Sequence, residues 1–276
     1  MADGPALLTA AVGGERRALA RLLTGIENQD PAFRELLPRI FAATRGAHLV
    51  GVTGPPGAGK STLVTALTRE YRTRGRRVGI VAVDPSSPYT GGAIMGDRIR
   101  MMEHAADREV FMRSMASRGE LGGIAATSWL VAAALDAAGY DPVVVETVGA
   151  GQAELEVADV VVVNKADRPG AERSARQLRA MLAGAGGRFA APPPILLTVA
   201  TTGEGIGALV DAIEADRERA RSADRALARA RNQLLRAVAE RSRRRAEARA
   251  EWEATVAEIA EHRLDPITAA DRLLGK

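Results

Sequence analysis

Between positions 49 and 61 the sequence reads Leu49-Val50-Gly51-Val52-Thr53-Gly54-Pro55-Pro56-Gly57-Ala58-Gly59-Lys60-Ser61. The residues from Gly54 onward fit the P-loop pattern, in which a glycine-rich turn ends in Gly-Lys-Ser. The context fits as well, because an apolar run enters the turn and a helical segment from Ser61 to Tyr71 leaves it. A chance glycine-rich turn is the alternative, and the flanking strand and helix argue against it. The sequence therefore predicts a phosphate-binding loop.

The chemistry of this loop follows from its residue types. Glycines let backbone N–H groups turn toward a phosphate without a Cβ clash, and the following helix N-terminus adds favourable partial charge. We expect Lys60 to reach the outer phosphates and the Ser61 hydroxyl to ligate magnesium. The predicted phosphate-binding residues are Gly54, Pro55, Pro56, Gly57, Ala58, Gly59, Lys60, Ser61 and Thr62.

A second motif, Asn164-Lys165-Ala166-Asp167, follows the apolar run Val160–Val163. A carboxylate at this place can accept from both the ring N–H and the exocyclic amine of guanine, which adenine does not offer in that arrangement. Such a tetrapeptide alone also forms ordinary loops, but downstream of a P-loop it favours GTP over ATP. We expect the base to be bound by Asn164, Lys165, Asp167, Val199, Ala200 and Thr201, the last three following the run Ile195–Leu197.

Three acidic residues are candidates for the magnesium and catalytic shell. Asp84 and Glu146 end the apolar runs Val78–Val83 and Val143–Val145, where a parallel sheet presents ligand-binding residues. Asp97 lies in a Pro/Gly/Ser-rich stretch typical of functional loops. The alternatives are a turn residue for Asp84 and a helix N-cap for Asp97. The predicted metal ligands are Ser61, Asp84, Asp97 and Glu146, the predicted catalytic residues are Lys60, Asp84, Asp97 and Glu146, and Gln152 is a candidate for orienting a water.

The apolar runs alternate with helical segments, which predicts an α/β fold: a P-loop NTPase with a mainly parallel sheet flanked by helices. We divide the chain into an N-terminal helical segment (1–44), a P-loop GTPase domain (45–216) and a C-terminal helical arm (217–276). Asp30-Pro31 predicts a helix start inside the first segment. The arm is too long and too polar to be stable alone, so we expect it to pack against a second copy or the core.

Composition narrows the function classes. Apolar residues make up 46% and aromatic residues 3%, and the chain has no cysteine, which excludes disulfides and thiolate metal sites. Its three histidines are scattered, which argues against a transition-metal centre. We found neither a secretory signal nor a bilayer-spanning run, so we expect a cytoplasmic protein without a membrane partner.

The net charge of +4 is uneven, because arginines gather near the C-terminus: Arg241, Arg243, Arg244, Arg245 and Arg249. Glutamates are interleaved with them, which favours the solvated face of a helix. The alternative is an acidic partner or nucleic acid. Because the sequence has no nucleic-acid recognition motif or aromatic stacking platform, we expect no nucleic-acid partner.

Together these motifs resemble the MeaB/ArgK-type GTPases, which act with adenosylcobalamin-dependent methylmalonyl-CoA mutase. The resembling segments are Gly51–Thr62, Val83–Pro88, Gly96–Met101, Arg113–Gly119, Glu146–Gly149, Asn164–Asp167 and Thr255–Ala260. The resemblance implies GTP/GDP and Mg²⁺ as ligands, a homodimer formed by the helical tail, and GTP hydrolysis coupled to cofactor loading and protection of the mutase.

The chain departs from that family after Glu154, where roughly thirty residues are missing, including a strand, a switch loop and a helix. The connection is also short on physical grounds, because consecutive parallel strands need a crossover of about a dozen residues that usually carries a helix. Only twelve residues separate Thr147 from Val160. Either Val160–Val163 takes the lost strand's place and displaces the guanine motif, or the sheet carries a defect.

Other functions stay open. A dimeric nucleotide-binding scaffold with impaired hydrolysis or coupling is the main alternative, because of the missing segment. A small-molecule kinase would need an acceptor pocket that the sequence does not reveal. A nickel-inserting GTPase would be expected to show Cys/His ligands, and this chain has no cysteine.

Overall fold

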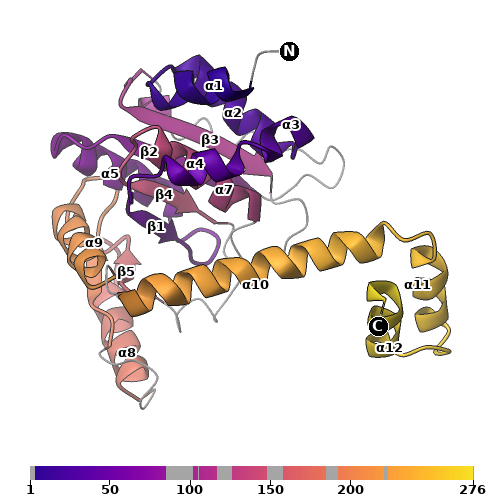
Figure 1. Ribbon diagram of the computed structural model, residues 1–276. Coiled ribbons are helices and arrows are strands. Elements are labelled where there is room, and N and C mark those ends of the chain that lie inside the picture. Colours follow the sequence, from indigo (N-terminus) through magenta and orange to yellow (C-terminus); the bar gives the residue numbers. More distant parts are fainter. Residues whose placement is uncertain are drawn as a thin grey trace. The chain divides into compact units, whose positions relative to one another are not determined.

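The computed structural model describes residues 4–84, 102–104, 106–116, 126–147, 158–184, 192–220 and 223–275. The chain divides into two compact units, Met1–Arg219 and Ala220–Lys276 (Figure 1), which are described separately below.

The first unit has the predicted α/β architecture, in which helices flank parallel strands (Figure 1). Strand β1 runs into the glycine-rich turn and helix α5 runs out of it, which confirms the predicted fold class. The elements are α1 (Gly4–Val12), α2 (Arg16–Glu27), α3 (Pro31–Arg34), α4 (Leu37–Ala42), β1 (Leu49–Val52), α5 (Lys60–Thr73), β2 (Val78–Asp84), η1 (Met102–His104), β3 (Val110–Ala116), α7 (Ala126–Ala137), β4 (Val143–Glu146), β5 (Val161–Asn164), α8 (Ala171–Gly184), β6 (Ile195–Thr198) and α9 (Ile206–Ala220).

The described strands form two parallel sheets, which bears on the two alternatives that the short connection before β5 left open. One has the strand order β1-β4-β2-β3, and the other contains β5 and β6. Strand β5 forms no pair with β1 among the described residues, so it does not take a place in the larger sheet. The short connection after Glu146 explains the break, because it leaves little room for a normal crossover. Of the two alternatives, the sheet defect is therefore correct.

Strand β3 was not among the predicted runs, because Arg113 and Ser114 interrupt its apolar pattern. It nevertheless pairs with β2 along its whole length, from Val110 opposite Val78 to Ala116 opposite Asp84. The Arg113 guanidinium forms an ion pair with Glu27 of α2, so its charge is neutralised where the strand meets the helix.

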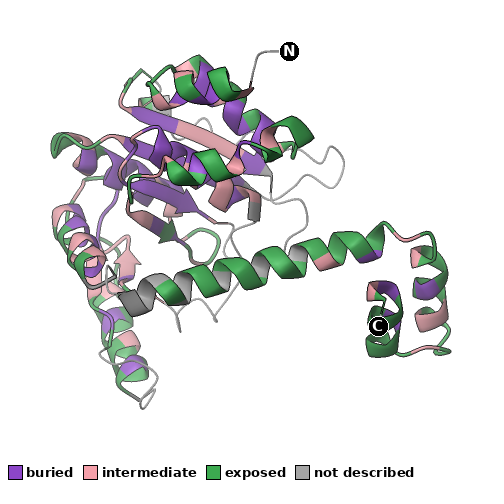
Figure 2. Ribbon diagram, in the orientation of Figure 1, coloured by how far each residue is buried: buried purple, intermediate pink, exposed green. Residues whose placement is uncertain are grey.

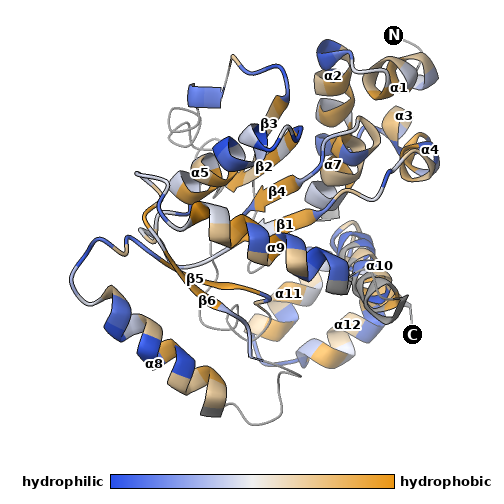
Figure 3. Cartoon of the chain, turned by 90° about the vertical axis from the view of Figure 1, so that its left-hand side faces the viewer, coloured by the Kyte–Doolittle hydropathy of each residue, from blue (hydrophilic) through white to orange (hydrophobic). Residues whose placement is uncertain are grey.

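Each face of the larger sheet is covered by its own apolar cluster. Val81, Val83, Val143 and Val145 pack with α1, α2, α4 and α7, whereas Ile80 and Val144 pack with α5 and α9. This division follows from the alternation of side chains along a strand. The two central strands, β2 and β4, are accordingly buried in Figure 2, and the strands of this sheet are largely apolar in Figure 3. Burial on both faces explains why the runs contain so few polar residues.

Asp141 connects three segments at the amino-terminal end of the sheet. Its carboxylate accepts from the His48 backbone N–H at 2.9 Å and from Arg217 of α9 at 2.9 Å, and Arg76 lies 3.7 Å away. The Arg217 side chain is only 11% exposed, and its other guanidinium nitrogen lies 3.7 Å from Glu214, so two carboxylates compensate its charge. The contact anchors α9, the helix that follows the predicted base-binding loop.

Because the imidazole of His48 is partly buried, we expect the protein to lose stability as the pH becomes acidic. Burial lowers its pKa below the ordinary 6.5, Arg217 lowers it further, and Glu214 and Asp141 oppose the shift. Its Nδ1 is buried and accepts or donates no hydrogen bond within the described part of the chain. The folded state thus favours the neutral ring. The contribution of His48 to the free energy of unfolding is therefore complete above pH 6.5 and is lost as the pH falls toward its lowered pKa.

We expect His48→Asn to flatten the fall of the free energy of unfolding between neutral and mildly acidic pH, measured by urea unfolding. The matched control is His262→Asn, since His262 is an exposed histidine in the left-handed region that asparagine tolerates. An unchanged pH slope in His48→Asn would contradict the assignment.

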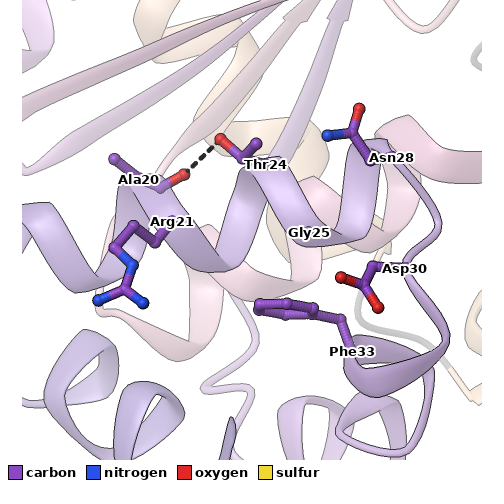
Figure 4. Close-up of a pocket in the computed structure, with 7 residues that line it drawn as sticks. All are labelled: Ala20, Arg21, Thr24, Gly25, Asn28, Asp30 and Phe33. Atoms are coloured by element: carbon purple, nitrogen blue, oxygen red, sulfur yellow. Dashed lines mark hydrogen bonds between the residues drawn. The ribbon is translucent and has the colours of Figure 1, made fainter. Parts of the chain in front are cut away.

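Helix α2 packs against Phe33 through Gly25, beside a surface pocket lined by both residues (Figure 4). A Cβ added at Gly25 would lie 2.4 Å from Phe33 Cδ2. We expect Gly25→Ala to destabilise the chain by about 1 kcal/mol, because the overpacking cost exceeds the gain in helix propensity.

The double variant Gly25→Ala/Phe33→Ala tests this contact in urea unfolding. Because the ring is then absent, it should be less destabilised than the sum of the single variants, with a coupling of roughly 1 kcal/mol. Additive effects would show that the ring does not resist the new methyl group.

The second unit contains α10 (Ala223–Glu247), α11 (Trp252–Ala260) and α12 (Pro266–Leu274). A turn at residues 248–251 ends the first of these helices. Asp265 begins α12 by accepting from the N–H groups of Ile267 and Thr268 at 2.9 and 3.0 Å. Arg243 pairs with Glu247 one turn away on an exposed face. In the described part of the chain no helix has both the length and the apolar character needed to cross a bilayer.

Candidate nucleotide-binding site

The P-loop joins the carboxyl end of β1 to helix α5. Gly57 and Gly59 adopt φ values of 77° and 88°, in the left-handed region that favours glycine. Helix α5 begins at Lys60, and its N-cap Gly59 offers no side chain to the first N–H groups of the helix. These groups have no intrahelical acceptor, so they are available to an anion.

The side chain of Lys60, the residue that follows the P-loop, extends back over that loop. Its Nζ donates to the carbonyl oxygens of Gly54 and Pro55 at 2.9 and 3.3 Å. Both acceptors are neutral, so a phosphate offers the ammonium group a stronger, charge-assisted partner. The side chain is thus held at the loop with its charge available for a ligand.

Ser61 and Glu146 meet where α5 begins and β4 ends. Ser61 Oγ donates to Glu146 Oε1 at 2.7 Å, and the two residues are 8% and 5% exposed. A hydroxyl and a carboxylate are oxygen donors of the kind that Mg²⁺ prefers, with phosphate and water completing its shell. In the described ranges, no group of three or more His, Cys, Asp or Glu side chains could hold a metal ion. The Ser61–Glu146 pair therefore fits a magnesium ion that is shared with a bound nucleotide.

Asn164 ties the guanine motif to the P-loop. Its Nδ2 donates to the carbonyl oxygens of Ala58 and Gly59 at 3.1 and 3.4 Å. Its Oδ1 accepts from Thr198 Oγ1 and from the Ala200 N–H, both at 3.2 Å. One side chain thus joins the P-loop, the end of β5 and the loop after β6.

Lys165 makes a second contact between the same two segments, since its Nζ donates to the Gly57 carbonyl oxygen at 2.6 Å. Asp167 lies exposed in the following turn. Val199 and Ala200 are buried, whereas Thr201 is exposed. The structure therefore brings the predicted phosphate and base motifs together, although β5 belongs to a separate sheet.

The remaining predicted residues are only partly described. Asp84 ends β2, two residues beyond Ala82, which is paired with Glu146. This register places its backbone at the same sheet edge as Glu146. Asp97 and Gln152 lie outside the described residues.

Two threonines at this edge were not among the predicted site residues. Thr147 Oγ1 donates to Thr53 Oγ1 at 2.9 Å, and the Thr147 N–H donates to the Val52 carbonyl oxygen at 3.0 Å. Both residues directly follow strands, which is the signal that could have identified them. They connect the turn after β4 to the start of the P-loop.

Curated relatives are similar over most of this chain. A protein of Pyrococcus abyssi described as "Putative GTPase" is 38% identical, and the alignment covers 95% of this chain and 93% of the relative. The "GTPase ArgK" of Escherichia coli is 43% identical over 54% of this chain and 46% of its own length. The mouse "Methylmalonic aciduria type A homolog, mitochondrial" is 38% identical over 56% of this chain and 41% of its own length.

A solved structure has a similar fold. The crystal structure of an "LAO/AO transport system kinase" superposes with a TM-score of 0.73 and 25% identity, and the match covers 99% of this chain and 96% of that chain.

The comparisons also locate a gap in this chain. The alignment with the Pyrococcus abyssi protein spans 300 positions but covers 95% of the 276 residues, which is about 262, so about 38 positions have no residue here. The model of the family "Methylmalonyl Co-A mutase-associated GTPase MeaB" matches in two parts, residues 19–158 and 153–255, which meet just before β5. Since these parts extend over most of the sequence, the chain belongs to the MeaB family of methylmalonyl-CoA mutase-associated GTPases.

Proposed function

We propose that this chain binds GTP with Mg²⁺, hydrolyses it, and thereby supports cofactor loading and protection of an adenosylcobalamin-dependent methylmalonyl-CoA mutase. The main observation in favour of GTP binding is that the Asn164 and Lys165 side chains donate to carbonyl oxygens of the P-loop. It holds the base-binding motif beside the phosphate-binding loop.

Each described residue has a distinct role in this proposal. The N–H groups at the start of α5 bind the phosphates, and Lys60 moves its charge from the loop carbonyls to the outer phosphates. Ser61 and Glu146 hold the magnesium ion, which supplies charge neutralisation on the phosphate oxygens. Asp167 accepts from the guanine base, and Asn164 and Lys165 position the turn that carries it.

Hydrolysis requires mainly positioning and electrostatic stabilisation. We assign these tasks to Lys60, Glu146, Asp84 and Asp97, with Asp97 outside the described residues. The names of the relatives support hydrolysis, since the Pyrococcus abyssi and Escherichia coli proteins are both described as GTPases. Phosphate release by the wild-type chain, absent in Lys60→Ala, is the expected result.

The mutase as partner rests on the description of the family and of the mouse relative. Dimerisation is supported by the exposed apolar residues of α10: Leu227, Leu234, Leu235 and Val238, which are 53% to 73% exposed. Apolar side chains at helical spacing on an otherwise polar helix are typical of a helix–helix interface.

A pull-down with methylmalonyl-CoA mutase, carried out with GDP, with a non-hydrolysable GTP analogue and without nucleotide, tests the partner. We expect retention of the mutase that depends on the nucleotide. Retention in none of the three states would reject the mutase as partner while leaving GTP binding unaffected.

A second candidate is a nucleotide-binding dimeric scaffold with impaired hydrolysis or coupling. The specific observation in its favour is the gap of about 38 alignment positions. GTP binding without phosphate release, with or without the mutase, would favour the scaffold. Because the similar crystal structure is described as a kinase, transfer of phosphate to added arginine is tested separately, by measuring phosphoarginine instead of released phosphate.

A further inference from the structure

The end of strand β4 contacts the chain on both sides of the P-loop. Glu146, the last residue of the strand, accepts from Ser61 Oγ at 2.7 Å, where helix α5 has just begun. Thr147, the next residue, donates from its Oγ1 to Thr53 Oγ1 at 2.9 Å, where β1 has just ended. Two consecutive residues thus hold the two flanks of the P-loop.

The register of the strands explains how both contacts arise. Strands β1 and β4 are parallel, with Val52 opposite Glu146, and the Thr147 N–H extends the ladder by donating to the Val52 carbonyl oxygen at 3.0 Å. The next positions along the two strands, Thr53 and Thr147, therefore lie opposite each other. Because side chains alternate along a strand, Thr147 points to the other face of the sheet from Glu146. The two contacts accordingly lie on opposite faces, one on the side of α5 and the other on the side of α7.

The two contacts respond differently to a magnesium ion. In the proposed function the ion is held by Ser61 and Glu146, whose oxygen atoms form the first contact. The ion takes up lone pairs of these oxygens, so the first contact changes when the metal binds. Neither threonine hydroxyl belongs to the proposed metal shell, so the second contact is the same with and without the ion.

We infer that Thr53 and Thr147 are positioning residues, whose hydrogen bond fixes Glu146 relative to the P-loop for magnesium and nucleotide binding. This role rests on the proposed binding of GTP and Mg²⁺, which it makes more specific. Thr147 follows Glu146 directly, so holding its side chain and its N–H restricts the backbone that carries the carboxylate. A carboxylate that is already held in place loses less conformational entropy when it binds the ion. The threonines thereby strengthen the coupling between magnesium and GTP without being ligands themselves.

The test replaces each hydroxyl by a methyl group in the full chain, as Thr147→Val and Thr53→Val. Calorimetric titration with GTP, in Mg²⁺ and in EDTA, gives the factor by which the ion raises the affinity. We expect each substitution to lower this factor about fivefold, the scale of one hydrogen bond, and to change the affinity in EDTA little. The double variant should lose no more than either single variant, because both remove the same bond. Thr147→Ser keeps the hydroxyl and should restore the factor.

The matched control is Thr73→Val, which should leave the factor unchanged. Thr73 is exposed at the far end of α5, where its hydroxyl donates to the Glu70 carbonyl oxygen at 2.7 Å. A second measurement needs no metal. In the nucleotide-free chain, Thr53→Val should speed hydrogen exchange of the Thr147 amide about fivefold, because the turn that this amide holds is less restrained.

The outcomes separate this role from the proposed function. An unchanged factor in Thr147→Val, or an equal loss of affinity in Mg²⁺ and in EDTA, overturns the positioning role and leaves GTP binding in place. Additive losses in the double variant, no rescue by Thr147→Ser, or unchanged exchange of the Thr147 amide in Thr53→Val overturn it as well. A wild-type chain whose GTP affinity does not depend on Mg²⁺ rejects the proposed magnesium site, and the positioning role with it.

Discussion

Replacing Asp167 by alanine is expected to lower the preference for GTP over ATP by about a hundredfold or more, with the whole loss in GTP affinity. A site that hydrogen-bonds a substrate N–H discriminates strongly against an analogue without it, so removing the acceptor removes the discrimination. Asp167 lies exposed in the turn after β5, and the neighbouring Lys165 is anchored to the P-loop. Its carboxylate is therefore accessible to a base.

Competition of ATP and GTP for labelled GTP measures this preference. The matched control is Glu172→Ala, which removes a carboxylate that is 83% exposed on α8 and should leave the ratio unchanged. Equal displacement by ATP and GTP in the wild-type chain would reject the assignment of base recognition to this motif.

Replacing Lys60 by alanine is expected to weaken GTP binding about a hundredfold, equal to about 2.8 kcal/mol. Among the described residues the ammonium group donates to two neutral carbonyl oxygens, at 2.9 and 3.3 Å. Alanine therefore removes only weak hydrogen bonds from the free protein, whereas in the complex it removes a charge-assisted bond to the triphosphate. The free energy of unfolding without nucleotide should change little, and binding should change greatly.

Calorimetric titration with GTP measures the affinity, and urea unfolding without nucleotide confirms that the variant folds. The matched control is Arg69→Ala, which removes a positive charge from the same helix. Arg69 is 48% exposed and paired with Glu103, and it lies nine residues along α5, about 13 Å from the loop. If Lys60→Ala binds GTP like the wild type, the P-loop assignment is wrong.

The individual motifs were predictable because they depend on local chemistry. The P-loop was predicted where it lies, between β1 and α5. The Asp30-Pro31 signal was also correct, since Asp30 accepts from the Ala32 N–H at the start of α3. Capping and glycine conformation act within a few residues, so they can be predicted without knowledge of the fold.

Elements of secondary structure that depend on residues distant in the sequence were not predicted. Strand β3 was not predicted because Arg113 interrupts its apolar pattern. A charged residue is accommodated there because it forms an ion pair with Glu27, which is distant in the sequence. The turn at residues 248–251, which separates α10 from α11, was not predicted either, because it contains no glycine or proline.

The sequence by itself determined the α/β class, the phosphate loop and the guanine motif, because each depends on residue types at fixed spacing. It also showed that the connection before β5 is too short, but it left two outcomes open. Only the tertiary structure decided between them. The Asn164 and Lys165 side chains hold the guanine motif to the P-loop, while β5 stays out of the larger sheet. Pairing of β5 with the larger sheet would need a longer crossover, whereas side-chain hydrogen bonds do not. The two motifs therefore stay together although the sheet is interrupted between β1 and β5.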